Sequence, residues 1–248
     1  MEVLTNEMCP QGSTEWLSLR EGAITGTKLG KYFAKDRKAE FGFDLGKPNL
    51  IFYETLAERL TVGSGDDGEE SEGLGSSRER GHDLEPIAID EAEFRLGKTF
   101  IRGGVWRFNN SHLCSPDGYT EDLTEAIEIK CLSSARHIKA ILENEAPSEY
   151  FAQFMNYFNN PKLERLYVAL YDPRFIDERY QLKIFTYERK DWEEEIQTAQ
   201  ELAEAINERL NDYIEHISNG DYLRLRGRGL AWPRSQLNVN DRSTPPYL

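Results

Sequence analysis

The stretch Ser115-Pro116-Asp117-Gly118, followed ten residues later by Glu128-Ile129-Lys130, decides how the fold of this 248-residue chain is interpreted. The Pro-Asp-Gly run is typical of a tight turn. The Glu-Ile-Lys triplet lies in a short apolar segment that predicts a strand, on which side chains two positions apart point to the same face. Glu128 and Lys130 are therefore expected on one face, with Ile129 on the opposite face, toward the core.

These side chains suggest a hydrolytic site. The two carboxylates, Asp117 and Glu128, suit a hard divalent cation such as Mg²⁺, and Lys130 beside them can position or help to activate a water. Hydrolysis of a phosphodiester needs such a nucleophile at neutral pH and a positive group for the developing charge. An Asp-Gly pair is, however, usually only a turn, and a Glu-x-Lys pair is usually an ion pair on a solvated strand face. Taken alone, the short motifs leave both interpretations open.

The composition favours one large globular domain. With 39% hydrophobic residues the chain can bury a sizeable core, and no apolar run approaches the ~20 residues that span a bilayer. The N-terminus lacks the basic start and apolar centre of a signal peptide. The three cysteines, Cys9, Cys114 and Cys131, form no CxxC pair, so they indicate neither a zinc site nor a disulfide framework. We expect a cytoplasmic protein with no membrane association.

The net charge of -14 argues against a simple nucleic-acid coat, because non-specific binding normally needs a basic surface. The charge is unevenly distributed, with basic side chains gathered between residues 28 and 38 and acidic ones between residues 66 and 72. A DNA enzyme can enclose a locally basic channel inside an acidic exterior. The charge therefore weakens a DNA-binding hypothesis without removing it.

Hydrophobic periodicity and capping residues predict an α/β layered domain over residues 1–220, with a flexible acidic loop at 63–77 and an irregular tail at 221–248. Pro86 fits poorly inside its helix, and Asp191 is expected to cap the last helix. Helices are expected at 15–21, 28–33, 49–60, 78–94, 134–144, 149–158 and 191–217. Strands are expected at 104–108, 112–115, 125–131, 165–171 and 180–187.

Three further segments offer polar groups that could join the carboxylate pair. Glu85, on the helix of residues 78–94, is a possible third acidic ligand, although a solvated helix carboxylate is the commoner case. Arg20 precedes Ile24-Thr25-Gly26-Thr27, and a guanidinium beside a hydroxyl and a helix start suits a phosphate group. The alternative is an ordinary surface arginine. Gln153, on an aromatic helix, says little by itself.

Taken in order, these motifs resemble the lambda-exonuclease family of phage recombination nucleases, which belong to the PD-(D/E)xK, restriction-endonuclease-like superfamily. The resemblance spans roughly Trp16 to Phe158. It implies a restriction-endonuclease-like core, in which helices flank a central mixed β-sheet. It rests on Trp-x-x-x-Arg-x-Gly-x-Ile-Thr from Trp16, Gly-x-x-x-Glu from Gly81, Ser-Pro-Asp-Gly, Glu-Ile-Lys-Cys and Tyr-x-x-Gln from Tyr150.

The resemblance also implies roles for particular residues. Glu85, Asp117 and Glu128, with the carbonyl of Ile129, would ligate Mg²⁺, for which Mn²⁺ would be a substitute. Lys130 would orient or deprotonate the attacking water. A pocket for the 5′-phosphate of the degraded strand would be formed by Arg20, Thr27, Ser115 and Gln153. Thr27 stands where the family often has a serine, so the hydroxyl is retained.

The activity implied by the resemblance is that of a metal-dependent 5′→3′ exonuclease. Such an enzyme degrades one strand of duplex DNA from its ends and leaves a 3′ single strand for recombination by strand annealing. The resemblance further implies a ring-shaped homo-oligomer, often a trimer, and a single-strand annealing protein as partner. Two alternatives stay open at this point: an endonuclease of the same fold, of restriction or repair type, and a catalytically inactive DNA-binding or assembly protein.

Overall fold

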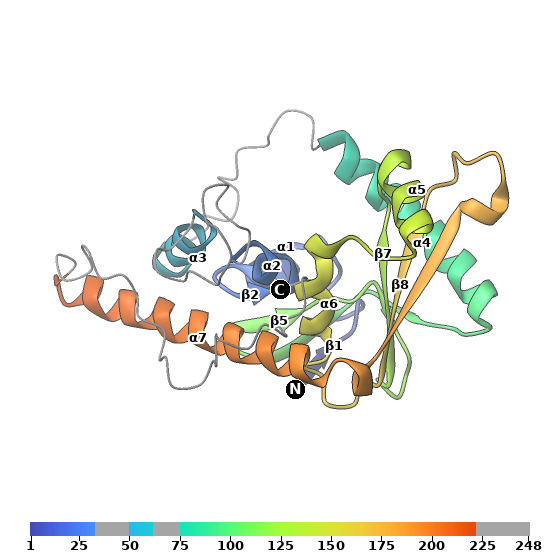
Figure 1. Ribbon diagram of the computed structural model, residues 1–248. Helices are drawn as coiled ribbons and strands as arrows, with labels where there is room; N and C mark the ends of the chain where they lie inside the picture. The colour runs from blue at the N-terminus through green and yellow to red at the C-terminus, as the bar shows by residue number, and fades with distance from the viewer. Residues whose placement is uncertain (33–49, 62–74, 222–248) are drawn as a thin grey trace, which may run out of the picture.

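The computed structural model describes residues 1–32, 50–61 and 75–221 of the chain (Figure 1). It is a mixed α/β structure with two mixed sheets flanked by helices. The predicted fold class is confirmed, although the strands form two sheets instead of one. No helix in these ranges combines the length and the apolarity needed to cross a bilayer.

The larger sheet carries the Asp-Gly and Glu-Ile-Lys motifs on neighbouring strands. Its five strands lie in the order β3-β6-β7-β8-β9. Only β7 and β8 run parallel, in a register that pairs Glu128 with Val168, and the other neighbours are antiparallel. The strands are β3 (Ile101–Arg102), β6 (Gly118–Tyr119), β7 (Glu125–Lys130), β8 (Arg165–Tyr171) and β9 (Leu182–Glu188).

The smaller sheet has four strands in the order β1-β4-β5-β2. The pairing of β2 with β5 is parallel, and the other two pairings are antiparallel. This sheet brings the end of β2, after which the segment with Thr27 begins, beside the strand that leads into Ser115. The strands are β1 (Glu2–Leu4), β4 (Val105–Asn109), β5 (His112–Cys114) and β2 (Ile24–Thr25).

Seven α-helices surround the sheets within the described residues, and most lie close to their predicted bounds. Between them are three short 3₁₀ turns, Ser148–Tyr150, Glu178–Tyr180 and Arg189–Asp191. The first of these replaces the start of the predicted helix 149–158. The helices are α1 (Thr14–Arg20), α2 (Gly26–Tyr32), α3 (Leu50–Leu60), α4 (Gly75–Leu96), α5 (Ser134–Glu143), α6 (Phe151–Tyr157) and α7 (Glu193–Ser218).

Helices α4 and α7 begin differently from the prediction. Helix α4 begins at Gly75 and continues through Pro86, so residues 75–77 are helical and do not belong to a loop. The rest of the predicted loop, residues 63–74, lies outside the described residues, as do residues 222–248 of the predicted tail. The cap of α7 is Trp192, not Asp191, which ends the preceding 3₁₀ turn.

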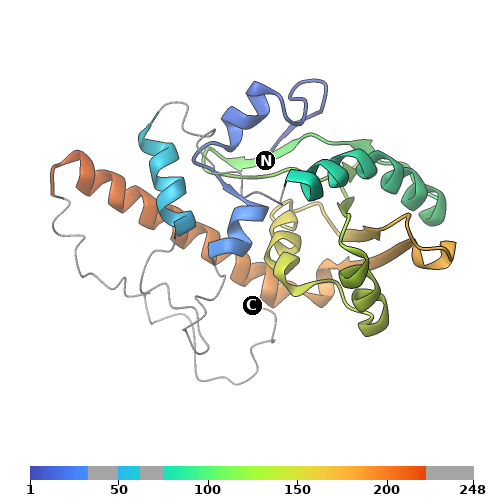
Figure 2. The same ribbon diagram turned by 90° about the horizontal axis from the view of Figure 1, so that it is seen from above.

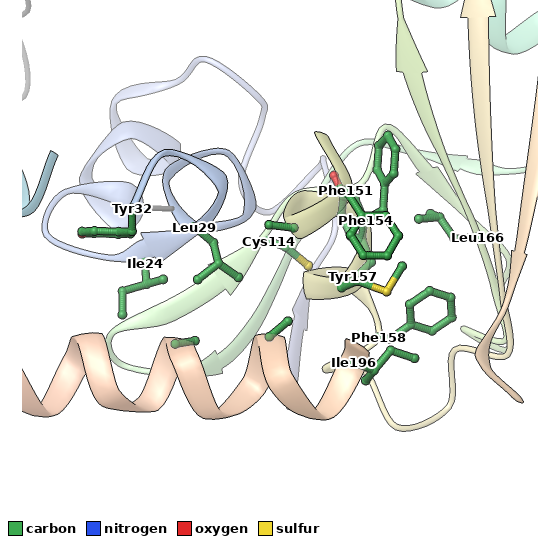
Figure 3. Packing of buried hydrophobic residues seen from close by; sticks show 14 of the residues in the cluster. Ile24, Leu29, Tyr32, Cys114, Phe151, Phe154, Tyr157, Phe158, Leu166 and Ile196 are labelled. Atoms are coloured by element: carbon green, nitrogen blue, oxygen red, sulfur yellow. The ribbon is translucent and has the colours of Figure 1, made fainter. Parts of the chain in front are cut away.

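The two faces of β7 enter different cores, and Glu128 and Lys130 lie on the face opposite to Ile129, as the alternation of side chains predicts. Ile127 and Ile129 pack with Ala88 and Ala92 of α4. Ala126, on the opposite face, joins the core built around α6 and α7. Figure 1 shows α4 and α6 on opposite sides of the large sheet, and Figure 3 shows the aromatic side chains of α6 that fill the second core. The charged positions of β7 thus face α6.

The turn after α1 is fixed by helix α3, which contacts α7 and crosses it at a large angle (Figure 2). Gly22 has φ +69, its N–H donates to Glu58 Oε2 at 2.7 Å, and its carbonyl accepts from Arg59 Nε at 2.7 Å. The guanidinium of Arg59 also donates to Asn207 and Asn211 of α7. These bonds hold the chain that follows Arg20 in a single position.

Replacing Gly22 with alanine is expected to lower the free energy of unfolding by about 2 kcal/mol or more. The left-handed conformation alone costs an alanine about 1–2 kcal/mol, and the new Cβ would lie 2.7 Å from Cγ of Arg59, whose guanidinium is already anchored. Gly97→Ala is the matched control, because Gly97 has φ +64 with no atom within 4 Å of the added Cβ. Urea unfolding measures both variants, and an equal loss in the two would contradict the packing part of this prediction.

Candidate active site

Asp117 is held against strand β7 by a backbone hydrogen bond. Its Oδ2 accepts from the N–H of Ile129 at 2.6 Å. The close approach of β6 to β7 requires glycine at the next position, because a Cβ on Gly118 would lie 2.9 Å from Ile127 Cγ2 and 2.9 Å from Phe100 Cβ. The Asp-Gly turn therefore does more than reverse the chain: it places a carboxylate beside the backbone of the Glu-Ile-Lys strand.

Glu128 is buried, with 3% of its surface exposed, and its carboxylate accepts three hydrogen bonds. Lys130 Nζ donates to Oε1 at 2.5 Å, and Gln153 Nε2 donates to the same oxygen at 2.7 Å. The hydroxyl of Tyr157 donates to Oε2. Lys130 also lies 4.8 Å from the ring centroid of Tyr150, a distance that suits a cation–π contact.

Burial and nearby charge raise the pKa of two of the three predicted acidic residues, Glu85 and Asp117. Burial, and then the charge of Glu128, raise the pKa of Glu85 on α4. Burial and the charges of Glu128 and Glu85 raise the pKa of Asp117 well above its usual range, more than Lys130 and the Ile129 N–H lower it. Burial is the larger cause of both shifts, and repulsion between the carboxylates adds to it, as expected where carboxylates lie near one another.

Lys130 remains an ammonium in this setting. Burial opposes its charged form, but the carboxylates of Glu128 and Asp117 outweigh burial and raise its pKa above the usual value. A group that holds its proton this firmly can donate hydrogen bonds and offset negative charge. Of the two roles predicted for Lys130, orientation of a water therefore fits the structure better than deprotonation of it.

The donor set fits a divalent cation by type and by charge. Carboxylate and carbonyl oxygens are the ligands that Mg²⁺ prefers, and burial, followed by repulsion from neighbouring carboxylates, raises the pKa of Asp117 and that of Glu85. Within the residues that the structure describes, no three acidic, histidine or cysteine side chains are close enough together to hold an ion. Glu128 instead faces Lys130, Gln153 and Tyr157. An ion shared by the three carboxylates would therefore require the side chains of Glu85 and Asp117 to move closer to Glu128.

Three of the four predicted phosphate-pocket residues come together next to Glu128. Arg20 Nη1 donates to Ser115 Oγ at 3.1 Å, although 95 positions separate the two residues. The guanidinium of Arg20 stacks on Trp16, 4.1 Å from its ring centroid. Burial lowers the pKa of Arg20, opposed by nearby groups that include Glu128. Gln153 reaches the same place through its bond to Glu128.

Thr27 lies inside helix α2 and not just before it. The helix begins at Gly26, two residues before its predicted start, and Thr25 caps it by accepting from the N–H of Lys28 at 3.2 Å. Thr27 is exposed in the first turn of α2, and the hydrogen bond that joins Arg20 to Ser115 does not include it. It lies next to Gly26, which packs on Gln153 so closely that a Cβ would be 3.0 Å from Cγ of that residue.

Tyr157, which donates to Glu128, is the residue of the site that the sequence did not predict. Burial and the charge of Glu128 raise its pKa well above the usual range, so its hydroxyl keeps its proton and can donate. The hydroxyl also lies 3.2 Å from the carbonyl oxygen of Ser115. The available signal was the i, i+4 spacing from Gln153, which places both side chains on one face of α6.

Comparison with solved structures finds three exonucleases of similar fold. The alkaline exonuclease LHK-Exo from Laribacter hongkongensis is 22% identical over 86% of this chain and 100% of its own, with a TM-score of 0.68. The structure of LHK-Exo in complex with dAMP is 23% identical over 86% of this chain and 100% of its own, with a TM-score of 0.67. A phage-related exonuclease from Haemophilus somnus 129PT is 14% identical over 82% of this chain and 99% of its own, with a TM-score of 0.58. These likenesses show a shared fold.

No curated protein matches the chain. Residues 15–159, more than half of the chain, match the YqaJ-like viral recombinase domain. The match covers the segment that carries every motif from Trp16 to Gln153, and it confirms the resemblance to phage recombination nucleases. The chain belongs to the YqaJ-like viral recombinase family.

Proposed function

We propose that this protein is a metal-dependent deoxyribonuclease that digests one strand of duplex DNA in the 5′→3′ direction and leaves a 3′ single strand for recombination. Family membership and the fold shared with exonucleases support a nuclease. The observation that carries the proposal is the turn of residues 115–117. Ser115 at its start contacts Arg20, and Asp117 at its end contacts the Glu-Ile-Lys strand. An anion pocket and a hydrolytic site would thus share one turn.

In this proposal Asp117, Glu85, Glu128 and the carbonyl of Ile129 hold Mg²⁺, with Mn²⁺ as a substitute. When bound, such a cation makes a water more acidic and offsets the charge of the phosphate under attack. The protein contributes the negative pocket that attracts the cation. The elevated pKa of Asp117 and of Glu85 is the expected signature of such a pocket before it is neutralised.

Lys130 holds and orients the attacking water. Its ammonium is fixed on one side by Glu128 and on the other by the ring of Tyr150. A fixed positive group also stabilises the extra charge that develops on the phosphate in the transition state, and it requires no reorganisation at that moment. This dual position explains why a lysine with a raised pKa serves the reaction.

Arg20, Ser115 and Gln153, with Thr27 nearby, bind the 5′-phosphate of the strand being degraded. A guanidinium binds phosphate oxygens through charge-assisted hydrogen bonds, and the stacking on Trp16 holds it ready. Because this pocket shares its turn with Asp117, a bound terminal phosphate would fix which phosphodiester reaches the hydrolytic site. The separation between the phosphate pocket and the hydrolytic site would thus set the register of cleavage.

The acidic exterior requires an explanation in any DNA enzyme. With a net charge of -14, a single subunit gains little non-specific affinity for DNA. A homo-oligomeric ring around the duplex would instead retain DNA by enclosing it. The resemblance implies such a ring, often a trimer. A single-strand annealing protein would then receive the 3′ strand.

The proposed function is tested by digestion of three duplexes with and without Mg²⁺: linear with 5′-phosphate, linear with 5′-hydroxyl, and closed circular. We expect Mg²⁺-dependent loss of the phosphorylated linear duplex, slower loss of the hydroxyl form, and intact circles. Cleavage of closed circles would favour an endonuclease of the same fold. Binding without cleavage of any substrate would favour an inactive assembly protein.

Replacing Arg20 with alanine is expected to reduce the preference for 5′-phosphorylated ends by about 10- to 100-fold. A hydrogen bond to a charged group contributes about 1.5–3 kcal/mol, and each 1.4 kcal/mol is a tenfold change. The ratio of kcat/KM for phosphorylated and hydroxyl ends measures the effect. Arg179→Ala is the control, because Arg179 forms an exposed ion pair with Asp177. An unchanged ratio in the Arg20 variant would show that Arg20 does not bind the 5′-phosphate.

A further inference from the structure

The hydroxyl of Tyr157 joins the two proposed subsites at a buried point. It donates to Glu128 Oε2, lies 3.2 Å from the carbonyl oxygen of Ser115, and accepts from Gln153 Nε2 at 3.2 Å. Only 1% of the tyrosine surface is exposed. One oxygen atom thus contacts the proposed metal ligand, the turn with the proposed phosphate pocket, and the amide between them.

Counting protons shows how this network directs Glu128. Lys130 and Gln153 both donate to Oε1, so both lone pairs of that oxygen are used. The single proton of Tyr157 goes to Oε2, because an ionised carboxylate is a stronger acceptor than the Ser115 carbonyl. One lone pair therefore remains on Glu128, and it is on the oxygen that Tyr157 binds.

We propose that Tyr157 is a positioning residue, which fixes the orientation of Glu128 so that the free lone pair of Oε2 is available to a divalent cation. The proposal rests on the proposed function, because it takes Glu128 as a metal ligand. Removal of the hydroxyl frees the carboxylate to rotate and leaves the Gln153 amide without its second acceptor. Partners that orient metal ligands typically contribute 10- to 100-fold in metal affinity.

The ring of Tyr157 is held firmly enough to serve this purpose. It packs edge-on against Trp106, at 6.4 Å between ring centroids and 90° between planes, within the core around Phe154 and Phe158 (Figure 3). The other side of the cluster provides a matched control. Tyr119 contacts the same Trp106 at 5.6 Å and is also buried, but its hydroxyl has no hydrogen-bond partner among the described residues.

The test compares the full-length wild type with Tyr157→Phe and Tyr119→Phe by calorimetric titration with Mn²⁺ in the absence of DNA. We expect Tyr157→Phe to weaken Mn²⁺ binding by about 10- to 100-fold and Tyr119→Phe to bind as the wild type does. Digestion of phosphorylated duplex supplies a second readout. The Tyr157 variant should lose kcat at low Mn²⁺ and recover it as Mn²⁺ is raised.

A merely structural role for Tyr157 predicts something different. It would lower the thermal unfolding midpoint and the fraction of active protein, but it would leave the Mn²⁺ dependence of the remaining activity unchanged, and that result would overturn the inference. Equal Mn²⁺ affinity in wild type and Tyr157→Phe would overturn it as well, while leaving the proposed function intact. A wild type that binds no Mn²⁺ would overturn both.

Discussion

Replacing Lys130 with alanine is expected to lower kcat by about 10²- to 10³-fold, the range found when one fixed hydrogen-bond donor to a developing charge is removed, while the protein remains folded. The ammonium is the one cation hydrogen-bonded to Glu128 in the described part of the chain. Its loss removes both the hydrogen bond that orients water and the positive charge beside the phosphate. The KM for DNA ends should change little, because the proposed phosphate pocket does not include this residue.

Lys183→Ala provides the control for this variant. Lys183 is also on a strand of the large sheet, and it also lies near an aromatic ring, 5.0 Å from the centroid of Phe185. Its ammonium donates to Asn144 instead of to a carboxylate of the site. Single-turnover digestion of phosphorylated duplex should show wild-type rates for Lys183→Ala. Full activity of Lys130→Ala would be incompatible with the role assigned to Lys130.

Replacing Asp117 with asparagine is expected to cut activity by about 10³-fold and yet stabilise the metal-free protein. Metal-assisted charge stabilisation supplies several kcal/mol, and each 1.4 kcal/mol is a tenfold change in rate. The raised pKa of Asp117 means that the folded state disfavours the ionised carboxylate. A neutral amide of the same shape can keep the bond from the Ile129 N–H, so the thermal unfolding midpoint should rise.

Asp122→Asn is expected to have the opposite effect on stability. Hydrogen bonds from Thr120 and Thr124 lower the pKa of Asp122, so the folded state favours its ionised form and the amide should lower the midpoint. Activity should stay at the wild-type level, because Asp122 lies in the turn between β6 and β7, at the end of β7 opposite to Lys130. Melting curves in a metal chelator measure both signs. A lower midpoint for Asp117→Asn would contradict the conclusion that the folded state disfavours the ionised carboxylate of Asp117.

The long elements of the fold could be predicted from the sequence because they carry enough residues for a periodic pattern. Strand β8 lies at its predicted bounds, and the Glu-x-Lys alternation of β7 correctly assigns its two faces. The strands that were missed, β1, β2, β3 and β6, have only two or three residues each. A strand of that length shows no alternation, and its pairing is decided by the rest of the sheet.

Helix ends were predicted less well because tertiary contacts override local preference. Thr25 and Thr27 are both suitable caps, and the pairing of Thr25 in β2 determines which one is used. Helix α4 accommodates Pro86 despite the missing N–H. Asp191 is the better cap by residue type, but it is taken up by a 3₁₀ turn.

The site was predicted in two different ways. The proximity of Asp117 to the Glu-Ile-Lys strand follows from a turn before an antiparallel pair, which a local pattern can indicate. The contact of Arg20 with Ser115 spans 95 positions and came from the family resemblance alone. Tyr157 belongs to no motif of that resemblance and looks like one more aromatic core residue, so its hydroxyl contacts become visible only in three dimensions.

The central claim, that carboxylates from three elements share one cation, is tested most directly by crystals grown with Mn²⁺ and measured at the manganese absorption edge. The account predicts an anomalous peak bonded to oxygens of Glu85, Asp117 and Glu128, with Tyr157 still donating to Glu128. At saturating Mn²⁺, these carboxylates pointing apart with no peak between them would contradict it.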